Sequence, residues 1–400
     1  MIDFHELLRK GKTFSTSKQG IIFYIWLAIA LFFAINSLIT HRFNNYLIFE
    51  NTFRNLITEQ SFYAQYPKFH DDVNHYGPVF SLFIAPFAML PNWLGLILWN
   101  VFNCVILFYA LQTLPIKSDK RVIIGYIAIP CLIESMLNQQ FNAAAAAFII
   151  LSFTRLNNNK GLWSSMLIVL GTFVKLYGVM GLSFFFFVKN KPRFIFYSIL
   201  WSVVFFILPM FFSSPLTIFE SYQEWFITLA EKNLTNTTQG SVPISIIGFF
   251  RSLIYDYDIP NLAFLMPGAF IFLIPFVKWS SFQGKTFRLL ILSSALLFPV
   301  LFSTSSEDCT YIISIVGVGL WYVHEKDYQI KKVLLPTLLV LCCNFPLLLF
   351  PVWAHKHPLS LAILSLPFFI VWLRIIYLAW AYQLEVEEEH SLEVSNLNIS

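Results

Sequence analysis

The sequence predicts an all-α polytopic membrane protein with about 12 transmembrane helices. Of its 400 residues, 57% are hydrophobic and only 12% are charged, which is too apolar and too poor in charge for a soluble globular domain. A bilayer core about 30 Å thick requires roughly 20 apolar residues for each helical crossing. Apolar runs recur from residue 21 to residue 382 with short polar breaks, so no stretch is left for a soluble catalytic domain.

Positive charge predicts how these segments are oriented, because Lys and Arg collect in cytoplasmic loops. Short basic turns recur along the chain at Lys117–Arg121, Arg155–Lys160, Lys189–Arg193, Lys278–Arg288 and Lys326–Lys332. We therefore expect a cytoplasmic N-terminal segment (1–20), a transmembrane domain (21–382) and a cytoplasmic acidic tail (383–400). The outer side then carries two large loops, 41–78 and 213–260, and three short turns. The formal net charge of +4 follows from the same trend and indicates no nucleic-acid partner.

Three segments depart from a simple series of crossings. Val79–Leu90 is short and ends before a proline, so it is either a re-entrant element or a short helix packed inside the protein. Gly161–Val188 holds Lys175 in its middle, which predicts two short helices that meet near the outer side. Asn51–Gln60 has the spacing of an amphipathic helix that lies on the membrane surface.

The first outer loop is the strongest candidate for chemistry, because it gathers ionisable groups just before the chain re-enters the membrane. It contains His70, Asp71, Asp72, His75 and Tyr76. Two adjacent carboxylates beside two histidines can supply a general base for a sugar hydroxyl. They can also ligate a divalent cation. The alternative is that both Asp residues only cap a turn and stay hydrated.

The sequence predicts no cofactor or dedicated metal site. The five cysteines are odd in number and show neither CxxC nor Cys/His ligand spacing. Neither a disulfide framework nor a zinc site is therefore indicated.

The order of several motifs carries a family resemblance. NNYLIFEN follows the first span, YGPVFSLFIAPFAMLP precedes Trp99, and NQQFNAAAAAFIILSF and GLWSSMLIVLGTFVKLYGVMGLSFFFFVKNK come next. Taken together over roughly residues 20–325, these features resemble glycosyltransferase family 87, a family of bacterial membrane mannosyltransferase-like enzymes of the GT-C class.

The resemblance implies a GT-C-like helical bundle in a bacterial inner membrane. It implies transfer of a hexose, expected to be mannose, from a polyprenyl-phosphate donor to an envelope glycan or glycolipid acceptor. Family members commonly carry an Asp base directly after the first span, where this chain has Asn44 and Asn45. An amide cannot act as the base. The base is therefore expected at Asp72, or else at Asp71 or Glu50, unless the chain is catalytically silent.

Other residues are expected to hold the donor phosphate. Lys175 lies in an apolar stretch, where an ammonium group usually has a polar cavity or an anionic partner, and its context VKLYG resembles a family signature. It can neutralise the departing phosphate, or it can belong to a structural ion pair or snorkel. Arg42 and Arg251, on the predicted outer side, can contact phosphate or be ordinary juxtamembrane charges.

Residues from several outer turns are expected to bind the sugar. These candidates are Asn45, Tyr46, His75, Tyr76, Gln140, Asn142 and Glu307. The amides can equally satisfy exposed helix ends, and Glu307 can equally be part of a solvated turn.

A transporter or flippase for a lipid-linked sugar is the alternative function. In that case Lys175 and the outer carboxylates would line a translocation path. Release of free polyprenyl phosphate distinguishes the two, because moving a lipid leaves its sugar bond intact.

Overall fold

The computed structural model describes residues 16–157, 160–238, 243–342 and 358–383, and within these ranges it contains helices and no strand. Three helices are long and apolar enough to cross a membrane: α2 (Lys18–Ile39), α5 (Asn92–Thr113) and α10 (Lys191–Ile207), the last extended by a 3₁₀ turn to Phe211. Several shorter apolar helices accompany them. The helical membrane class is therefore confirmed, while the number of about 12 crossings stays a prediction.

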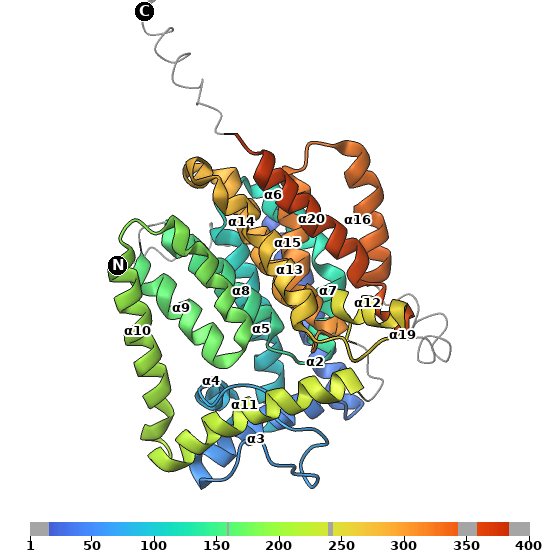
Figure 1. The fold of residues 1–400 in the computed structure, drawn as a ribbon. Coiled ribbons are helices and arrows are strands. Elements are labelled where there is room, and N and C mark those ends of the chain that lie inside the picture. Colours follow the sequence, from blue (N-terminus) through green and yellow to red (C-terminus); the bar gives the residue numbers. More distant parts are fainter. Residues whose placement is uncertain (1–15, 158–159, 239–242, 343–357, 384–400) are drawn as a thin grey trace, which may run out of the picture.

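The remaining elements complete a bundle with helices lying across one end (Figure 1). They are α3 (Asn44–Thr58), α4 (Phe80–Ala88), α6 (Ser118–Ile127), α7 (Ile129–Leu137), α8 (Asn142–Asn157), α9 (Gly161–Val174), η1 (Leu176–Phe187), α11 (Pro215–Thr238), α12 (Ile246–Ile254), α13 (Leu262–Leu273), α14 (Lys285–Leu301), α15 (Tyr311–His324), α16 (Tyr328–Cys342), α19 (Pro358–Ala362) and α20 (Ser365–Ala381).

One end of the bundle gathers several of the basic turns, and we call it the basic end. Lys18 at the start of α2 lies 3.9 Å from Asp119 at the start of α6. Lys278 donates to the backbone oxygen of Trp380 at 2.7 Å, which joins the turn after α13 to the end of α20. Three of the turns predicted to share a side also contribute residues to one cavity at this end: Lys160, Lys189 with Arg193, and Arg288. Which side faces the cytoplasm stays a prediction.

The opposite end, which we call the loop end, is built by the connections 59–79, 138–141 and 302–310 and by helix α11. The indole nitrogen of Trp225 in α11 donates to the backbone oxygen of His75 at 2.9 Å. Asn236, near the C-terminal end of α11, donates through its side chain to the backbone oxygen of Thr304 at 2.8 Å. Figure 1 shows α3 and α11 lying across this end of the bundle. Segments more than 150 residues apart in sequence thus form one surface.

The short segment after the first loop is a helix with one buried face. Helix α4 has nine residues, so it spans only about 13 Å at 1.5 Å per residue. It packs between α3 and α5. Val79–Leu90 therefore forms one short helix, and whether it re-enters the membrane stays a prediction.

Helix α3 corrects the expected surface helix at Asn51–Gln60. It begins seven residues earlier, at Asn44, and its buried face includes Tyr46, Phe49 and Leu56. Ile57, expected on the same apolar side as Leu56, is 55% exposed. Leu56 lies about two turns after Phe49 and shares its buried face, whereas Ile57 is rotated by about 100° from Leu56.

The predicted pair of short helices around Lys175 is confirmed. Helix α9 ends at Val174, Lys175 is extended (φ −147°, ψ 125°), and the 3₁₀ helix η1 begins at the next residue. A Cβ at Gly178 would lie 2.2 Å from the carbonyl carbon of Gly171, so the return of the chain against α9 requires glycine there. Gly77 donates to the backbone oxygen of Val174 at 3.1 Å, which fixes this turn against the first loop.

Candidate active site

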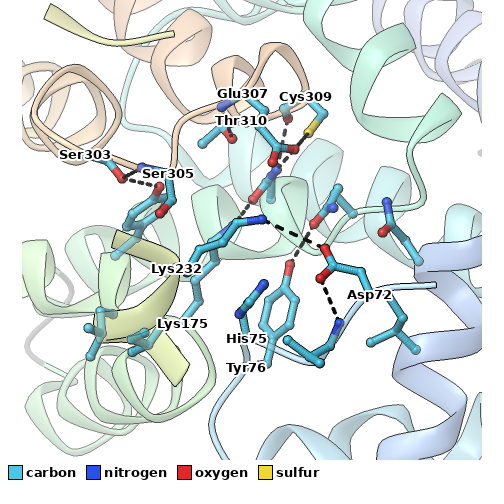
Figure 2. Close-up of a pocket in the computed structure, with 18 of the residues that line it drawn as sticks. Asp72, His75, Tyr76, Lys175, Lys232, Ser303, Ser305, Glu307, Cys309 and Thr310 are labelled. Carbon is cyan, nitrogen blue, oxygen red and sulfur yellow. Dashed lines mark hydrogen bonds and ion pairs between the residues drawn. The ribbon is translucent and has the colours of Figure 1, made fainter. Parts of the chain in front are cut away.

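The loop end contains a cavity of about 310 Å³ where the first loop, the turn at Lys175, helix α11 and the 302–310 connection meet (Figure 2). Eight of the predicted site residues line it: Asn45, Asp72, His75, Tyr76, Gln140, Asn142, Lys175 and Glu307. They come from five separate stretches of the chain. The fold therefore collects most of the predicted groups around one space.

Asp72 and Lys232 place opposite charges across this cavity, as Figure 2 shows. Their charged atoms are 3.9 Å apart, and the two side chains are 56% and 27% exposed, respectively. The other carboxylate oxygen of Asp72 accepts from the backbone N–H of Val73 at 2.8 Å. The carboxylate is thus oriented but retains lone pairs for another partner.

Lys175 carries a second positive charge into the cavity. Its ammonium donates to the side-chain oxygen of Asn142 at 2.6 Å. It also lies 5.4 Å from the ring centre of Tyr76 and 4.9 Å from that of Tyr177. One hydrogen bond and two ring faces leave an ammonium with donors still available to an anion.

Tyr76 is positioned by the aromatic core below the cavity. Its ring stacks on Phe80 with centroids 4.6 Å apart, and its hydroxyl donates to the side-chain oxygen of Gln140 at 2.8 Å. The Tyr63 hydroxyl donates to the backbone oxygen of Tyr76 at 2.9 Å. These contacts fix the ring, so it offers a rigid apolar surface next to Lys175.

His75 brings an uncharged imidazole to the cavity. Burial, followed by the nearby charge of Lys232, lowers the pKa of His75 to about 4. Both ring nitrogens lack a hydrogen-bond partner among the described residues. A buried neutral imidazole of this kind can donate one hydrogen bond and accept another from a bound molecule.

Glu307 lines the cavity from the opposite wall. It precedes a short 3₁₀ turn, where its backbone N–H donates to the Thr310 hydroxyl at 3.2 Å in a capping box. Cys309, in the same turn, accepts from Asn142 through its backbone oxygen at 3.0 Å. This turn therefore holds Asn142, which in turn holds Lys175.

Four predicted site residues do not line the cavity. Asp71 is exposed, and its backbone N–H donates to the Asn44 side chain at 2.9 Å. Tyr46 is fully buried, and its hydroxyl donates to the backbone oxygen of Phe87 at 3.1 Å, because the phase of α3 turns it into the core. Glu50, the other carboxylate considered, is buried and paired with Arg54.

The two predicted arginines also lie elsewhere. Arg42 is exposed at the start of α3 and is not among the lining residues. Arg251 is buried, and its guanidinium donates to the backbone oxygen of Ile259 and, at 2.8 Å, to the Asn261 side chain. These partners come from the connection to α13, so Arg251 stabilises that connection rather than lining the cavity.

Lys232 is the charged lining residue that sequence reasoning missed. The stretch 213–260 reads as a loop, whereas the structure forms helix α11 over Pro215–Thr238. Trp225, Leu229 and Lys232 all line the cavity. Their spacing of four and three residues places them on one helical face, which is the signal that identifies this residue.

The described part of the chain contains no group of three or more His, Cys, Asp or Glu side chains arranged to hold a metal ion.

A helical membrane protein with a charged and aromatic cavity at one end is thus defined. Residues 74–304 match the model of glycosyltransferase family 87, more than half of the chain, so the chain belongs to glycosyltransferase family 87. The resemblance seen in the motifs is confirmed, and the class of activity is transfer of a sugar from a donor to an acceptor. The matched region includes His75, Tyr76 and Lys175, whereas Asp72 precedes it. No curated protein matches the sequence.

Proposed function

We propose that the protein transfers a hexose, mannose in the first instance, from a polyprenyl-phosphate sugar to a glycan or glycolipid acceptor in the bacterial cell envelope. The enzyme would be of the GT-C class, with its cavity on the outer face of the inner membrane. The observation that carries this proposal is the placement of two carboxylates, Asp72 and Glu307, and two ammonium groups, Lys175 and Lys232, around a single cavity, with Asp72 and Lys232 3.9 Å apart. Transfer from a phosphate-linked donor needs both a base and cations.

Asp72 would act as the general base. A hydroxyl of the acceptor gives its proton to the carboxylate while its oxygen attacks the anomeric carbon of the donor. The bond from that carbon to the phosphate oxygen breaks, and polyprenyl phosphate leaves with the bonding electrons. A single displacement of this kind inverts the anomeric configuration. Asp71 does not line the cavity, which favours Asp72 over Asp71 for this role.

Lys175 and Lys232 would stabilise the departing phosphate. Negative charge grows on the phosphate as the bond breaks, and ammonium groups placed in advance lower the energy of that state more than the energy of the bound donor. In this role Lys232 replaces the arginines expected from the sequence, since neither Arg42 nor Arg251 lines the cavity.

The remaining lining residues would hold the sugar. The ring of Tyr76 offers an apolar face, and His75 offers ring nitrogens that lack partners among the described residues. Asn45, Gln140 and Asn142 add amide groups to the lining, and each already makes at least one contact that orders the site. A cavity of about 310 Å³ is within the range of ordinary small-ligand sites.

The proposal is tested with purified full-length protein in lipid, supplied with radiolabelled polyprenyl-phosphate mannose and an envelope extract. Wild type is compared with Asp72→Asn, and Asp71→Asn is the matched control because it makes the same change one residue away, outside the cavity. We expect Asp72→Asn to lower label transfer and polyprenyl-phosphate release by about 10²- to 10⁴-fold, and Asp71→Asn to leave both near wild type.

Equal transfer by wild type and Asp72→Asn would refute the assignment of the base. Movement of intact donor across the bilayer without release of polyprenyl phosphate would refute glycosyl transfer and support the flippase alternative. Absence of both transfer and movement with mannose and other hexose donors would support a catalytically silent member.

A further inference from the structure

A second cavity, of about 590 Å³, lies at the basic end of the bundle. It is formed where α8 ends and α9 begins, where η1 passes into α10, and by residues at and just before the start of α14. It shares no lining residue with the cavity at the loop end. The proposed transfer reaction therefore does not use it.

The lining of this second cavity carries one sign of charge. Four basic residues face it, Lys160, Lys189, Arg193 and Arg288, and none of its described lining residues is acidic. Within the described ranges, no ion pair involves Lys160, Lys189 or Arg193. Like charges gathered around one space repel each other, so an anion that enters is favoured.

Backbone geometry adds to this positive potential. Helix α9 begins at Gly161 without a side-chain cap, whereas helix α10 begins at Lys191 and is capped by the Asn190 side chain, which accepts from the backbone N–H of Arg193 at 3.1 Å. Both starts lie beside the cavity. The N-terminus of a helix carries partial positive charge and free N–H groups, which favour anions.

Arg288 shows that one wall is pre-formed. Its guanidinium donates to the backbone oxygen of Phe282 at 2.5 Å and to the Gln283 side chain at 3.3 Å, and it lies 5.2 Å from the ring centre of Phe187. The guanidinium is thus held in place against an aromatic wall.

Apolar side chains share the lining of the cavity with the charged ones, which favours a lipid over a free ion. Trp163, Phe187 and Phe194 line it beside the charged groups. Helix α10, which forms one side, exposes Ile195, Phe196 and Ile199 along its outer face, as a lipid-facing helix does. A molecule with a phosphate headgroup and acyl chains can satisfy both parts at once.

We propose that this cavity, the basic pocket, binds the phosphate headgroup of an anionic phospholipid. The headgroup phosphate lies among Lys160, Lys189, Arg193 and Arg288, and the acyl chains run along α10. Basic pockets between membrane helices at the cytoplasmic surface are suited to such headgroups. The proposal is independent of glycosyl transfer, since it concerns the opposite end of the molecule.

The test is native mass spectrometry of the full-length protein in detergent, titrated with phosphatidylglycerol or with phosphatidylcholine. The variant Lys160→Gln/Lys189→Gln/Arg193→Gln is compared with Lys117→Gln/Lys120→Gln/Lys332→Gln. The second variant also removes three positive charges, but from residues that do not line the pocket. We expect wild type to bind phosphatidylglycerol at least about tenfold more tightly than phosphatidylcholine, and only the pocket variant to lose this preference.

A charge-conserving variant, Lys160→Arg/Lys189→Arg/Arg193→Lys, should retain the preference. Equal losses in the pocket variant and the distant variant would overturn the proposal, because they would show general surface attraction. If millimolar inorganic phosphate displaces bound phosphatidylglycerol and the two bind with equal affinity, the pocket is a simple phosphate site. That result would overturn the proposal that a lipid occupies it. An unchanged thermal transition in each variant excludes misfolding as the cause.

Discussion

Two ion pairs at opposite ends of the molecule show how differently the same chemistry can be used. At the basic end, Glu325 accepts from Arg374 at 2.7 and 3.1 Å, and its side chain is only 1% exposed. At the loop end, Asp72 and Lys232 are 3.9 Å apart and both are partly exposed. The first pair is closed and fully bonded, while the second is open to the cavity.

The closed pair has no capacity left for a ligand. Besides Arg374, Glu325 accepts from the Trp321 indole at 3.2 Å and from the backbone N–H of Asp327 at 2.9 Å. Burial disfavours its charged form, but the hydrogen bonds from Arg374, Asp327 and Trp321, together with the charge of Arg374, outweigh this and hold the pKa of Glu325 below its ordinary value. The comparison indicates that the closed pair stabilises the fold and that the open pair is available for chemistry.

Apart from Asp72, the largest effect on transfer is expected at Lys175, a further charged residue of the same cavity. Lys175→Gln should lower transfer about 10²- to 10³-fold, because it removes a charge placed toward the leaving phosphate. Gln can still donate to Asn142, so the thermal transition should not fall. The assay is single-turnover release of polyprenyl phosphate, and Lys175→Arg, which keeps the charge, should recover part of the rate. Full activity in Lys175→Gln would place the leaving group elsewhere.

A substitution in the closed pair should lower the stability of the protein without changing the activity of the molecules that remain folded. Glu325→Gln leaves Arg374 without its anionic partner and should lower the free energy of unfolding by about 3 kcal/mol. This value is at the low end of the range for broken buried ion pairs, because the Arg374 side chain is 24% exposed. Denaturant titration in detergent measures it. Glu220→Gln, the same change on an exposed residue of α11, should stay within about 0.5 kcal/mol. Equal values for the two variants would contradict the structural role.

His75 should make stability depend on pH. The folded protein keeps His75 neutral down to about pH 4, whereas an unfolded chain binds a proton near pH 6.5. Stability from this residue is therefore present above about pH 6.5 and declines as the pH falls toward 4.

The corresponding experiment compares wild type with His75→Asn. Between pH 7 and pH 5, wild type should lose about 2 kcal/mol more unfolding free energy than His75→Asn. His41→Asn is the control, because His41 is exposed outside the cavity. Parallel pH curves for wild type and His75→Asn would show that burial of His75 does not affect its titration.

The smallest effect is expected at Lys232. A partly exposed ion pair contributes little to folding stability, so Lys232→Gln should change the free energy of unfolding by less than about 1 kcal/mol. Transfer should fall only about 3- to 10-fold, because solvent screens its charge more than that of Lys175. Steady-state transfer assays compare it with Lys68→Gln, an exposed lysine of the first loop outside the cavity. A larger loss than that of Lys175→Gln would reverse their proposed order.

Much of the fold was readable from the sequence because it depends on local patterns. The helical membrane class follows from apolar runs, the short helix α4 from its length before a proline, and the break at Lys175 from a charge in an apolar stretch. The start of α3 was not readable, since polar residues such as Asn44 and Asn45 mark a loop as readily as a helix start.

The candidate site divides in the same way. Residue types and the order of loops determined that Asp72, His75, Tyr76 and Lys175 are candidates, and the family resemblance rests on the same local strings. Only the tertiary structure shows that Asp72 lines the cavity while Asp71 does not, and that Lys232 lies beside Asp72. Sequence alone determines which chemistry a segment can offer, because that depends on its own side chains. Which side chain faces the cavity depends on how helices distant in sequence pack, and that is decided only when they meet.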